Sequence, residues 1–524
     1  MSQPIQHVVI VGGGTAGWMT AASLIHRLAI KNIKVTLVES SDIATVGVGE
    51  ATVPAIRSYF ASLGLDTYDV MKATQGTFKL GIEFKGWRHE GHRFFHPFAR
   101  YGIEAGPVGF HHLWQRLKEA GEPWPLDDYC LGSELMIQGR FALPDPQPRA
   151  DFQIYDWAVH FDASLFAKFL RGYAEKRGMT RIDAKVTTVE QNSESGFIER
   201  LQLDNGETIA GDLFIDCSGF RGLLIQGALK TGFRDWRKYL PCDRAVALPC
   251  SHLLRSGAAQ APRMGSGGPS PLPSEEAPEI AVATRVTAQA AGWMWRIPLQ
   301  HRVGNGYVYS SDHISDADAE AALRGALDSD ALANPNFVRF TAGHAEQLWN
   351  RNCVAIGLAG GFLEPLESTS ITLIQSGINK LLLRFPNAAC EPAVVAEYNR
   401  LSALEFERIR DFIILHYWAS HRPEALWAQC RDMVLPDTLR HKIELYKASG
   451  QFARYDAESF FDPSFLCMYD GFDIEPRAYD PFADNFALDD LKELTRNIRA
   501  DVKGMALEGE RHSDFIRKHC AAVG

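Results

Sequence analysis

Apolar runs and one helical pattern alternate in the N-terminal part of the chain and predict a strand, a helix and a second strand. HVVIV (7–11) is a continuous apolar run, TAGWMTAASLIHRL (15–28) has a helical pattern, and IKVTLVES (33–40) is a second run that ends in an acid. Apolar strands joined through a helix are typical of a parallel sheet with both faces covered. We therefore expect an α/β fold on a parallel sheet.

A glycine-rich turn lies between the first strand and the helix. Gly12, Gly14 and Gly17 have the GxGxxG spacing of a dinucleotide-binding fingerprint, and Glu39 ends the second strand. In this motif the glycines allow a tight turn, close approach of the backbone to a pyrophosphate, and close helix–strand packing. The acid is placed to bind a ribose hydroxyl. The motif alone fits FAD and NAD equally.

Two later segments predict a β-meander. RIDAKVTTVEQ (181–191) and GFIERLQLDNGETIAGDLFIDCSG (196–219) contain short strand patterns, with a hairpin-turn signal at Asp204, Asn205 and Gly206. A meander inserted before a further strand resembles the FAD module of the glutathione-reductase type. No second GxGxxG unit follows a strand, so the sequence shows no site for a nicotinamide cofactor.

An aromatic strand is predicted at GWMWRIPLQ (292–300). In an extended strand Trp293 and Trp295 point to the same face and would form one broad aromatic plate, and Pro298 would end the strand. Taken alone, such a strand is more often part of a buried core.

Helical patterns predict much of the remaining chain. One helix should begin at Ser368 and Thr369, before the apolar run ITLIQSGINKLLL (371–383). A second, amphipathic helix is predicted from the apolar positions Phe406, Ile409, Ile413 and Tyr417.

The resemblance to an FAD module implies that the chain has two parts. The FAD module should comprise residues 1–55, 150–300 and 340–390. A mainly helical substrate lobe should comprise residues 56–149, 301–339 and 391–524. Residues 253–278 are dense in Gly, Pro, Ala and Ser and predict a mobile surface loop.

Composition and charge narrow the class of protein. The 524 residues are 46% hydrophobic and 23% charged, with a net charge of -10, which is typical of a globular protein with a sizeable core. The acidic balance argues against a nucleic-acid partner, and no apolar segment is long enough to span a membrane. Since the N-terminus lacks a signal-peptide pattern, we expect a cytoplasmic protein with small-molecule partners.

Cysteine and histidine spacings give no indication of a metal site. The nine cysteines include no CxxC pair, so neither a disulfide framework nor a zinc site is indicated, and reduced thiols are expected. HEGH (89–92) lacks the i, i+4 histidine spacing of a zincin helix, and His111 and His112 do not change this expectation.

Eight short segments, spread over most of the chain, form a specific combination. They are GGGTAGW (12–18), GVGEATVP (47–54), TFKLGIEF (77–84), HPF (96–98), DCSGFRGLL (216–224), WMWRIP (293–298), GYVYSS (306–311) and EPLESTSI (364–371). Together they resemble the flavin-dependent halogenases of the tryptophan halogenase family. The WxWxIP pattern distinguishes these enzymes from flavin monooxygenases.

The resemblance implies a reaction sequence. In the family, reduced FAD reacts with oxygen to give a flavin hydroperoxide, halide attacks its distal oxygen, and hypohalous acid travels through a tunnel to the substrate. An aromatic wall would keep the substrate from the flavin and prevent its hydroxylation. The implied tunnel wall consists of Trp293, Trp295, Ile297 and Pro298.

Two residues match the catalytic positions of the family. Lys79 would hold the electrophilic halogen; a lone lysine is usually a solvated surface charge, but between Phe78 and Leu80 it can be partly desolvated, which lowers the pKa of the amine. Glu367 would stabilise the positive ring of the substrate and could accept its proton. Taken alone, Glu367 is more often a charge at a helix start.

The resemblance also implies sites for halide, cofactor and substrate. The backbone amides of Thr369 and Ser370 would bind the halide, but the tryptophan enzymes usually carry glycine where this chain has Ser370, so the choice between chloride and bromide stays open. The expected cofactor-binding residues are Gly12, Gly14, Thr15, Ala16, Gly17, Glu39, Gly49, Glu50, Ala51 and Leu358. The expected substrate-pocket residues are His96, Pro97, Phe98, Ser368, Phe461 and Phe465, with Phe460 in the same aromatic stretch.

The expected function is halogenation, with chloride or bromide, of an electron-rich aromatic such as an indole derivative. A separate NAD(P)H-dependent flavin reductase should supply reduced FAD, and the halogenase should be a monomer or a homodimer. Free tryptophan is not the first expectation, because the paired tyrosines, glutamate and Phe-Trp dipeptide that clamp it in the family have no clear counterparts here.

Two alternatives remain at this point. One is a flavin monooxygenase that hydroxylates an aromatic substrate, although AIGLAGGF (355–362) lacks the Gly-Asp pair that hydroxylases use on the ribityl chain. The other is a non-catalytic FAD-binding protein, which would be expected to have lost Lys79, Glu367 or the tryptophan pair.

Overall fold

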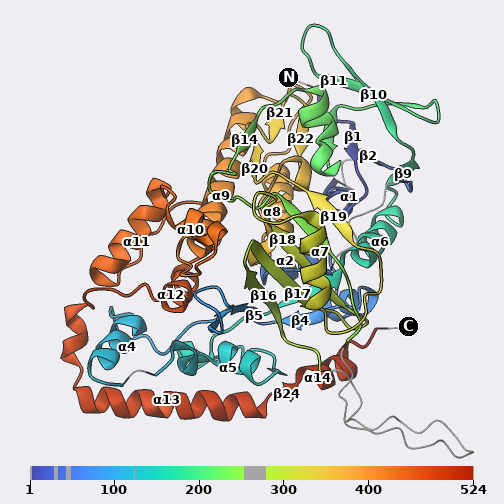
Figure 1. The fold of residues 1–524 in the computed structure, drawn as a ribbon. Helices are drawn as coiled ribbons and strands as arrows, with labels where there is room; N and C mark the ends of the chain where they lie inside the picture. The colour runs from blue at the N-terminus through green and yellow to red at the C-terminus, as the bar shows by residue number, and fades with distance from the viewer. Residues whose placement is uncertain (1–2, 29–32, 43–48, 123, 253–278, 523–524) are drawn as a thin grey trace, which may run out of the picture.

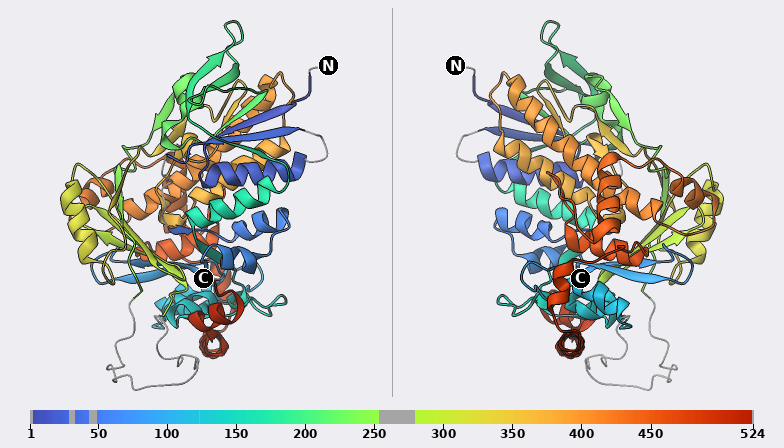
Figure 2. Two further views of the ribbon diagram at one scale, coloured as in Figure 1. Left: turned by 90° about the vertical axis from the view of Figure 1, so that its right-hand side faces the viewer. Right: turned by 90° about the vertical axis from the view of Figure 1, so that its left-hand side faces the viewer.

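The computed structural model describes residues 3–28, 33–42, 49–122, 124–252 and 279–522. The predicted loop at 253–278 lies outside the described residues. Several sheets and the helices around them share a large apolar core that draws on distant parts of the sequence. Figures 1 and 2 show the N-terminal sheet and its helices at one end of the molecule and a long helix from the C-terminal part of the chain at the other.

A six-stranded sheet carries the N-terminal fingerprint. Its order is β21-β22-β13-β1-β2-β9, and the pairs from β22 to β9 are parallel, whereas β21 is antiparallel to its neighbour. The strands are β1 (His7–Val11), β2 (Lys34–Glu39), β9 (Thr180–Asp183), β13 (Leu213–Asp216), β21 (Trp349–Asn350) and β22 (Cys353–Ala355). The expected parallel sheet is confirmed.

A three-stranded antiparallel meander precedes β13 in the chain. It consists of β10 (Val186–Gln191), β11 (Ile198–Leu203) and β12 (Thr208–Ala210). The predicted hairpin turn joins β11 to β12, and Gly206 adopts a φ of 85° there, a left-handed conformation that favours glycine. The predicted meander is therefore confirmed.

A seven-stranded mixed sheet packs next to these elements. Its order is β19 (Asn336–Arg339), β15 (Arg244–Ala247), β18 (Val303–Tyr309), β17 (Gly292–Pro298), β16 (Ala283–Gln289), β5 (Gly81–Lys85) and β6 (Arg93–Pro97). Strand β17 ends at Pro298 as predicted. Strands from both predicted parts of the chain share this sheet, and the division into two parts stays a prediction.

Short strands complete the described sheets. Strand β8 (Ala158–Asp162) lies between β3 (Gly49–Ala51) and β4 (Thr77–Lys79) and places Lys79 opposite Ala158. The other strands are β14 (Phe233–Asp235), β20 (Gly343–Ala345), β23 (Gly361–Phe362), β7 (Arg140–Phe141) and β24 (Glu510–Arg511).

Helices near the N-terminal sheet pack on one another as well as on strands. Helix α1 packs against α6 and α8, and α2 also contacts α8. The helices of this group are α1 (Thr15–Leu28), α2 (Ala55–Ser62), α3 (Thr67–Ala73), α6 (Ala163–Glu175) and α8 (Ser370–Leu383). Helix α7 (Asp316–Gly325) packs instead on β15 and β18 of the seven-stranded sheet.

The remaining helices form the part of the molecule where a helical lobe was expected. They are α4 (Phe110–Glu119), α5 (Leu131–Ile137), α9 (Pro392–Trp418), α10 (Ala425–Arg431), α11 (Asp437–Ser449), α12 (Asp462–Gly471), α13 (Leu488–Glu508) and α14 (His512–His519). Helix α13 runs beneath α4 and α5 (Figure 1) and packs on both. In α9 the four predicted apolar positions are buried, so the amphipathic helix is confirmed.

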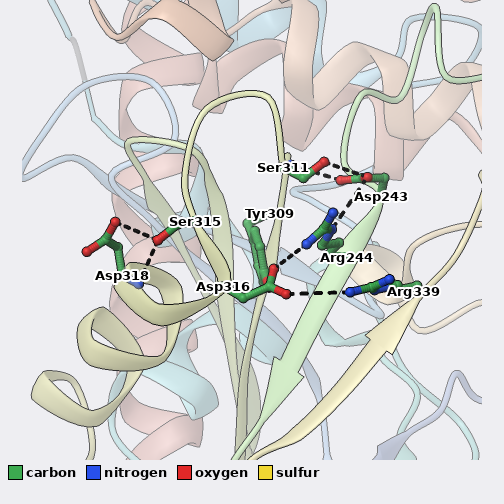
Figure 3. A network of polar contacts seen from close by, with 8 residues as sticks. All are labelled: Asp243, Arg244, Tyr309, Ser311, Ser315, Asp316, Asp318 and Arg339. Carbon is green, nitrogen blue, oxygen red and sulfur yellow. Dashed lines mark hydrogen bonds and ion pairs between the residues drawn. The ribbon is translucent and has the colours of Figure 1, made fainter.

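A polar network ties α7 to the edge of the seven-stranded sheet (Figure 3). Asp316 at the start of α7 accepts hydrogen bonds from Arg244 of β15 at 2.6 Å and from the Tyr309 hydroxyl of β18 at 2.8 Å. Arg339 of β19 adds an ion pair with Asp316 at 3.9 Å. The network therefore holds together the three strands that form one wall of the large cavity described below.

The described helices include none that combines the length and the apolar character needed to cross a bilayer. All nine cysteines are buried and unpaired.

Candidate active site

A cavity of about 1120 Å³ opens at the carboxyl ends of β1, β2 and β13 and extends to the seven-stranded sheet. In α/β sheets this edge is the usual ligand position. The expected cofactor-binding residues that line it are Gly12, Gly14, Thr15, Ala16, Glu39, Gly49, Glu50, Ala51 and Leu358. The structure therefore brings these predicted residues together around one space large enough for a dinucleotide.

The three fingerprint glycines differ in what surrounds them. Gly12 has a φ of 113°, and a Cβ there would lie 2.2 Å from the carbonyl oxygen of Cys217. A Cβ on Gly17 would lie 1.9 Å from the carbonyl oxygen of Gly12, so Gly17 lets α1 pack closely on the turn. A Cβ on Gly14 would meet no atom within 4 Å. Gly14 therefore leaves open space beside the backbone at the start of α1, where a phosphate can approach.

Glu39 is held by a partner that sequence reasoning missed. Its Oε1 accepts a hydrogen bond from Nε of Arg181 at 2.5 Å. On its other side, a Cβ on Gly13 would come within 1.4 Å of its Oε2, so glycine at that position leaves room for the carboxylate. Arg181 lines the cavity together with Glu39. Sequence reasoning could not pair these two residues, because Arg181 lies on β9, which is next to β2 in the sheet but 142 positions away in the chain.

Glu50 presents a carboxyl group to the same cavity. Burial raises its pKa from the usual value of 4.5 to about 7. Among the described residues, no side chain or backbone group forms a hydrogen bond with this carboxyl. Near neutral pH it is therefore partly protonated and able to donate a hydrogen bond to a bound group.

Lys79 lies behind the cavity, fully buried. Its Nζ donates hydrogen bonds to the carbonyl oxygen of Thr52 at 2.9 Å and to Oγ of Ser368 at 2.7 Å. Its Nζ also lies 5.2 Å from the centre of the Phe98 ring. Burial lowers the pKa of Lys79 from 10.5 to about 7, although the nearby Glu367 carboxylate opposes the shift. The amine is thus partly neutral, and nucleophilic, at neutral pH.

Ser368 connects Lys79 with the cavity. It lines the cavity and accepts the hydrogen bond from Lys79. Its φ of 59° is a left-handed conformation, which is uncommon for serine and costs backbone strain. In this conformation Ser368 connects the 3₁₀ turn Pro365–Glu367 to the start of α8. Ser368 is therefore a direct hydrogen-bonded link between the Lys79 amine and the lining of the cavity.

A second polar chain links the Lys79 strand to the cavity. The Thr77 hydroxyl donates to the carbonyl oxygen of Pro298 at 2.7 Å, so it must accept the hydrogen bond from Nδ1 of His160 at 2.9 Å. Burial, followed by the charge of Lys79, lowers the pKa of His160 well below 6.5, which keeps its ring neutral. Its Nε2 therefore accepts from the hydroxyl of Thr284, which lines the cavity. Sequence reasoning missed this chain, since neither His160 nor Thr284 belongs to a recognised motif.

The Glu367 carboxylate is buried between two imidazole rings. Its Oε2 lies 2.9 Å from Nδ1 of His96, and its Oε1 lies 2.8 Å from Nε2 of His416. Burial alone raises the pKa of Glu367, but the contacts with the two histidines outweigh it and lower the pKa to about 2. Glu367 is therefore an anion at neutral pH. His416 was not predicted, although a histidine inside the apolar run FIILHYW (412–418) is a usable signal.

The two tryptophans do not form the single plate that was predicted. Their ring planes are inclined by 60°, with 6.3 Å between ring centres. Trp295 lines the cavity with Ile297, whereas Trp293 is fully buried and lies outside its lining. The reason is a hydrogen bond: the Trp293 indole N–H donates to Oε2 of Glu364 at 2.7 Å, which turns its ring toward the core.

Glu364 is a further buried carboxyl that sequence reasoning missed. It also accepts a hydrogen bond from the Tyr417 hydroxyl, at 2.6 Å. Burial raises the pKa of Glu364 to about 7, against the lowering effect of its hydrogen bonds from Tyr417 and Trp293. Glu364 lies just before α8 and thereby links Trp293 of β17 to Tyr417 of α9, which fixes the orientation of the indole ring.

Helix α8 begins beside the cavity as predicted, with Thr369 as its N-cap residue and Ser370 as its first residue. The amides in the first turn of a helix have no acceptor within the helix. Ser370 lines the cavity, and the buried hydroxyl of Thr369 has no hydrogen-bond partner among the described residues. Free donors at a helix N-terminus suit an anion.

The predicted substrate residues occupy different environments. His96, Pro97 and Phe98 follow one another at the end of β6, next to Lys79 and Glu367. Phe465 is buried, whereas Phe461 is 59% exposed. Phe460 instead stacks on Phe412, with 4.0 Å between ring centres, and both rings contact His96. The aromatic neighbour of His96 in this stretch is thus Phe460.

Comparison with known families identifies the arrangement. A family model described as tryptophan halogenase matches residues 7–488. The chain belongs to the tryptophan halogenase family.

Curated and solved relatives agree with this assignment. The chain is 37% identical over 462 residues to the tryptophan 6-halogenase SttH from Streptomyces toxytricini, covering 84% of this chain and 83% of that protein. The structure of BrvH, a flavin-dependent halogenase from Brevundimonas sp. BAL3, has 45% identity and a TM-score of 0.91, covering 98% of this chain and 99% of that chain. Xcc4156, a flavin-dependent halogenase from Xanthomonas campestris, has 41% identity and a TM-score of 0.90 and covers both chains fully, at 100% each.

This member of the tryptophan halogenase family is a flavin-dependent halogenase, which uses FAD and a halide ion. Its residues fit the cofactor: open space beside Gly14 at the start of α1 can receive a pyrophosphate, and Glu39 lies where a ribose is expected. Within the described residues, no cluster of three His, Cys, Asp or Glu side chains could hold a metal ion.

Filling the open space at Gly14 should weaken cofactor binding by this halogenase. Gly14→Val should lower the affinity for FAD by about tenfold or more, equivalent to at least about 1.4 kcal/mol, because the added side chain begins in space that is open to the cavity, where a Cβ meets no protein atom within 4 Å. Titration of FAD followed by flavin fluorescence measures this. Gly172→Val in α6 is the matched control, since a Cβ there also meets no atom within 4 Å. Equal affinity in both variants would place the pyrophosphate elsewhere.

Proposed function

We propose that this halogenase acts on an indole-type aromatic, with Lys79 holding the electrophilic halogen and Glu367 stabilising the positive ring. The observation that carries the proposal is the buried Lys79 amine, hydrogen-bonded to a serine that lines the cofactor cavity. Relatives named tryptophan halogenases support an indole as the aromatic class.

When bound, reduced FAD supplies the electrons with which oxygen is activated for the oxidation of halide to hypohalous acid. The residues of the chain then have separate tasks. The amides of Thr369 and Ser370 and the unpaired Thr369 hydroxyl would hold the halide beside the cavity. Trp295 and Ile297, which line the cavity, would keep the aromatic substrate out of it. Pro298 ends this wall, and Trp293 supports it from behind.

The halogen would reach the substrate past Ser368. Lys79 would bind it through hydrogen bonding of the hypohalous acid, or its neutral amine, for which the pKa of about 7 leaves a neutral fraction, would attack the halogen. In that case a nitrogen–halogen bond forms, the halogen–oxygen bond breaks, and the oxygen leaves as water with the proton lost from the amine. The aromatic carbon would then take the halogen while the bond from halogen to its carrier breaks and leaves its electron pair on that carrier. The anionic Glu367 would stabilise the resulting positive ring.

The substrate side favours an indole without a fixed amino-acid head group. His96, Phe98 and Phe460 offer aromatic surface near Lys79 and Glu367. Clear counterparts of the tyrosines, glutamate and Phe-Trp pair that clamp free tryptophan were not found in the sequence. A separate flavin reductase would supply reduced FAD, since a second dinucleotide fingerprint is absent from the sequence.

A substrate panel tests the proposal. The protein would be incubated with a flavin reductase, FAD, NADH, bromide or chloride, and with indole, free tryptophan, other indoles and phenols, and product masses would be compared. We expect halogenated indoles in higher yield than halogenated phenols, and free tryptophan below indole. A preference for phenols would overturn the proposed substrate class, and a preference for free tryptophan would show that its amino and carboxyl groups are recognised.

A further inference from the structure

Both carboxylate oxygens of Glu367 already have a hydrogen-bond partner within the protein. We call Glu367, His96 and His416 the Glu367 cluster; all three side chains are almost fully buried. Each carboxylate oxygen faces one imidazole nitrogen, at 2.9 Å and 2.8 Å. A carboxylate with a pKa near 2 and two hydrogen bonds is a weak base. It suits charge stabilisation better than removal of a proton from the substrate.

The hydrogen-bond pattern of His416 places a proton inside the cluster. Its Nδ1 lies 2.7 Å from the carbonyl oxygen of Phe412, which can only accept, so Nδ1 carries a hydrogen. Its Nε2 faces Oε1 of Glu367, so a second proton must lie between these two atoms. With Glu367 ionised, that proton is on His416. The His416 ring is enclosed by Phe84, Trp87 and other aromatic side chains.

His96 is the other partner, and one of its nitrogens is available. Its Nδ1–H donates to Oε2 of Glu367. No hydrogen bond from its Nε2 to another described residue is formed. Because the Nδ1–H group is used in the contact with Glu367, Nε2 is the ring nitrogen that offers a lone pair to a proton when the imidazole is neutral.

We infer that Nε2 of His96 accepts the proton that leaves the ring of the substrate, while Glu367 and His416 orient His96 and stabilise its charged form. The inference rests on the proposed function. In this step the C–H bond at the halogenated carbon breaks, its electron pair restores the aromatic ring, and the proton forms an N–H bond on His96. The imidazolium then returns the proton to solvent. A carboxylate that orients an imidazole and stabilises its cation is an established arrangement for general-base catalysis.

The variant His96→Asn separates the two roles of this residue. An asparagine amide can still donate to Oε2 of Glu367 from the position of Nδ1, but it has no nitrogen base at the position of Nε2. His96→Gln is the second variant, with its amide nearer the position of Nε2. The matched control is His112→Asn, because His112 is also buried and accepts a hydrogen bond, from the amide of Asp480 at 3.1 Å, without contact to the Glu367 cluster.

The measurement is the yield of halogenated product per reduced flavin consumed. Ordinary indole and indole deuterated at the carbon that the wild-type enzyme halogenates are used in separate reactions. Hypohalous acid that escapes is recorded with a chemical trap. In wild type and in His112→Asn, both substrates should give equal yields. In His96→Asn and His96→Gln the yield should fall by at least about tenfold, with the deuterated substrate falling further, because loss of the ring proton then competes with loss of the halogen.

Each outcome is decisive. A wild-type yield in both His96 variants, or a lower yield without an isotope effect, overturns the inference, since the proton would then have another acceptor or His96 would only shape the pocket. Trapped hypohalous acid shows that the flavin chemistry of the variants is intact. If the wild-type enzyme itself halogenates no aromatic in the panel, it is the proposed function that fails.

Discussion

Lys79→Ala should lower the yield of halogenated indole by about a thousandfold or more, while FAD binding and consumption of reduced flavin stay close to wild type. Lys79 does not line the cofactor cavity; it lies behind Ser368, to which it donates a hydrogen bond. Hypohalous acid can therefore still form in the variant, but no amine holds it beside the substrate. Loss of oriented proximity of this kind costs several orders of magnitude in rate, since effective molarities of well-oriented reactions reach about 10⁵ to 10⁸ M. Product mass and trapped hypohalous acid measure the two quantities.

The controls exclude a folding defect. Lys79→Met fills a similar volume, and below the pKa of about 7 it removes the cost of burying a charged amine. At pH 6 its melting temperature should therefore be at least that of wild type, and this advantage should shrink as the pH rises from 7 toward 10.5, where the wild-type amine is neutral in the folded state. Lys442→Met, at another buried lysine, should halogenate normally. A wild-type product yield in Lys79→Ala would show that the amine does not hold the electrophile.

Glu367→Gln should slow halogenation by about 10² to 10³, the usual effect of removing one oriented charge from a transition state. The glutamine cannot accept hydrogen bonds from both histidines, because its amide N–H₂ would face one of their N–H groups. The variant therefore loses the negative charge and the orientation of His96 together. Single-turnover rates with saturating indole measure the effect.

A substitution at a second buried carboxyl group, Glu364, is the control that separates the loss of charge at Glu367 from a disturbance of packing. Glu364→Gln can keep its acceptor oxygen for Trp293 and Tyr417, and Glu364 is separate from the Glu367 cluster. It should reduce the rate far less than Glu367→Gln does. Equal losses in the two variants would indicate general disturbance of the turn before α8 and would contradict a specific role for Glu367.

The cofactor half of the molecule was predictable from the sequence because its signals are local. Gly12, Gly14 and Gly17 lie within one turn, and Gly206 marks its hairpin within a few residues. Backbone sterics fix the structure at such positions. The start of α8 at Ser370 and the buried face of α9 were predictable for a similar reason, since apolar spacing alone specifies them.

The candidate site was only partly predictable because its contacts are long-range. Lys79 and Ser368 are 289 positions apart in the chain, and His96 and Glu367 are 271 apart. Resemblance to the family pointed to these residues, but not to His416. The single tryptophan plate was wrong because a strand pattern fixes the face of Trp293 but not the turn of its ring, which depends on Glu364.

The most direct test of the central claim is the mass of the product that the wild-type protein forms from indole in the presence of reduced FAD, oxygen and bromide. Trp295 and Ile297 line the cofactor cavity, and the Lys79 amine, outside this lining, donates a hydrogen bond to Ser368, which lines it. The account predicts a product in which one hydrogen is replaced by one bromine, with the paired masses of the bromine isotopes. A product that has instead gained one oxygen would show that the substrate reaches the flavin and would contradict the account.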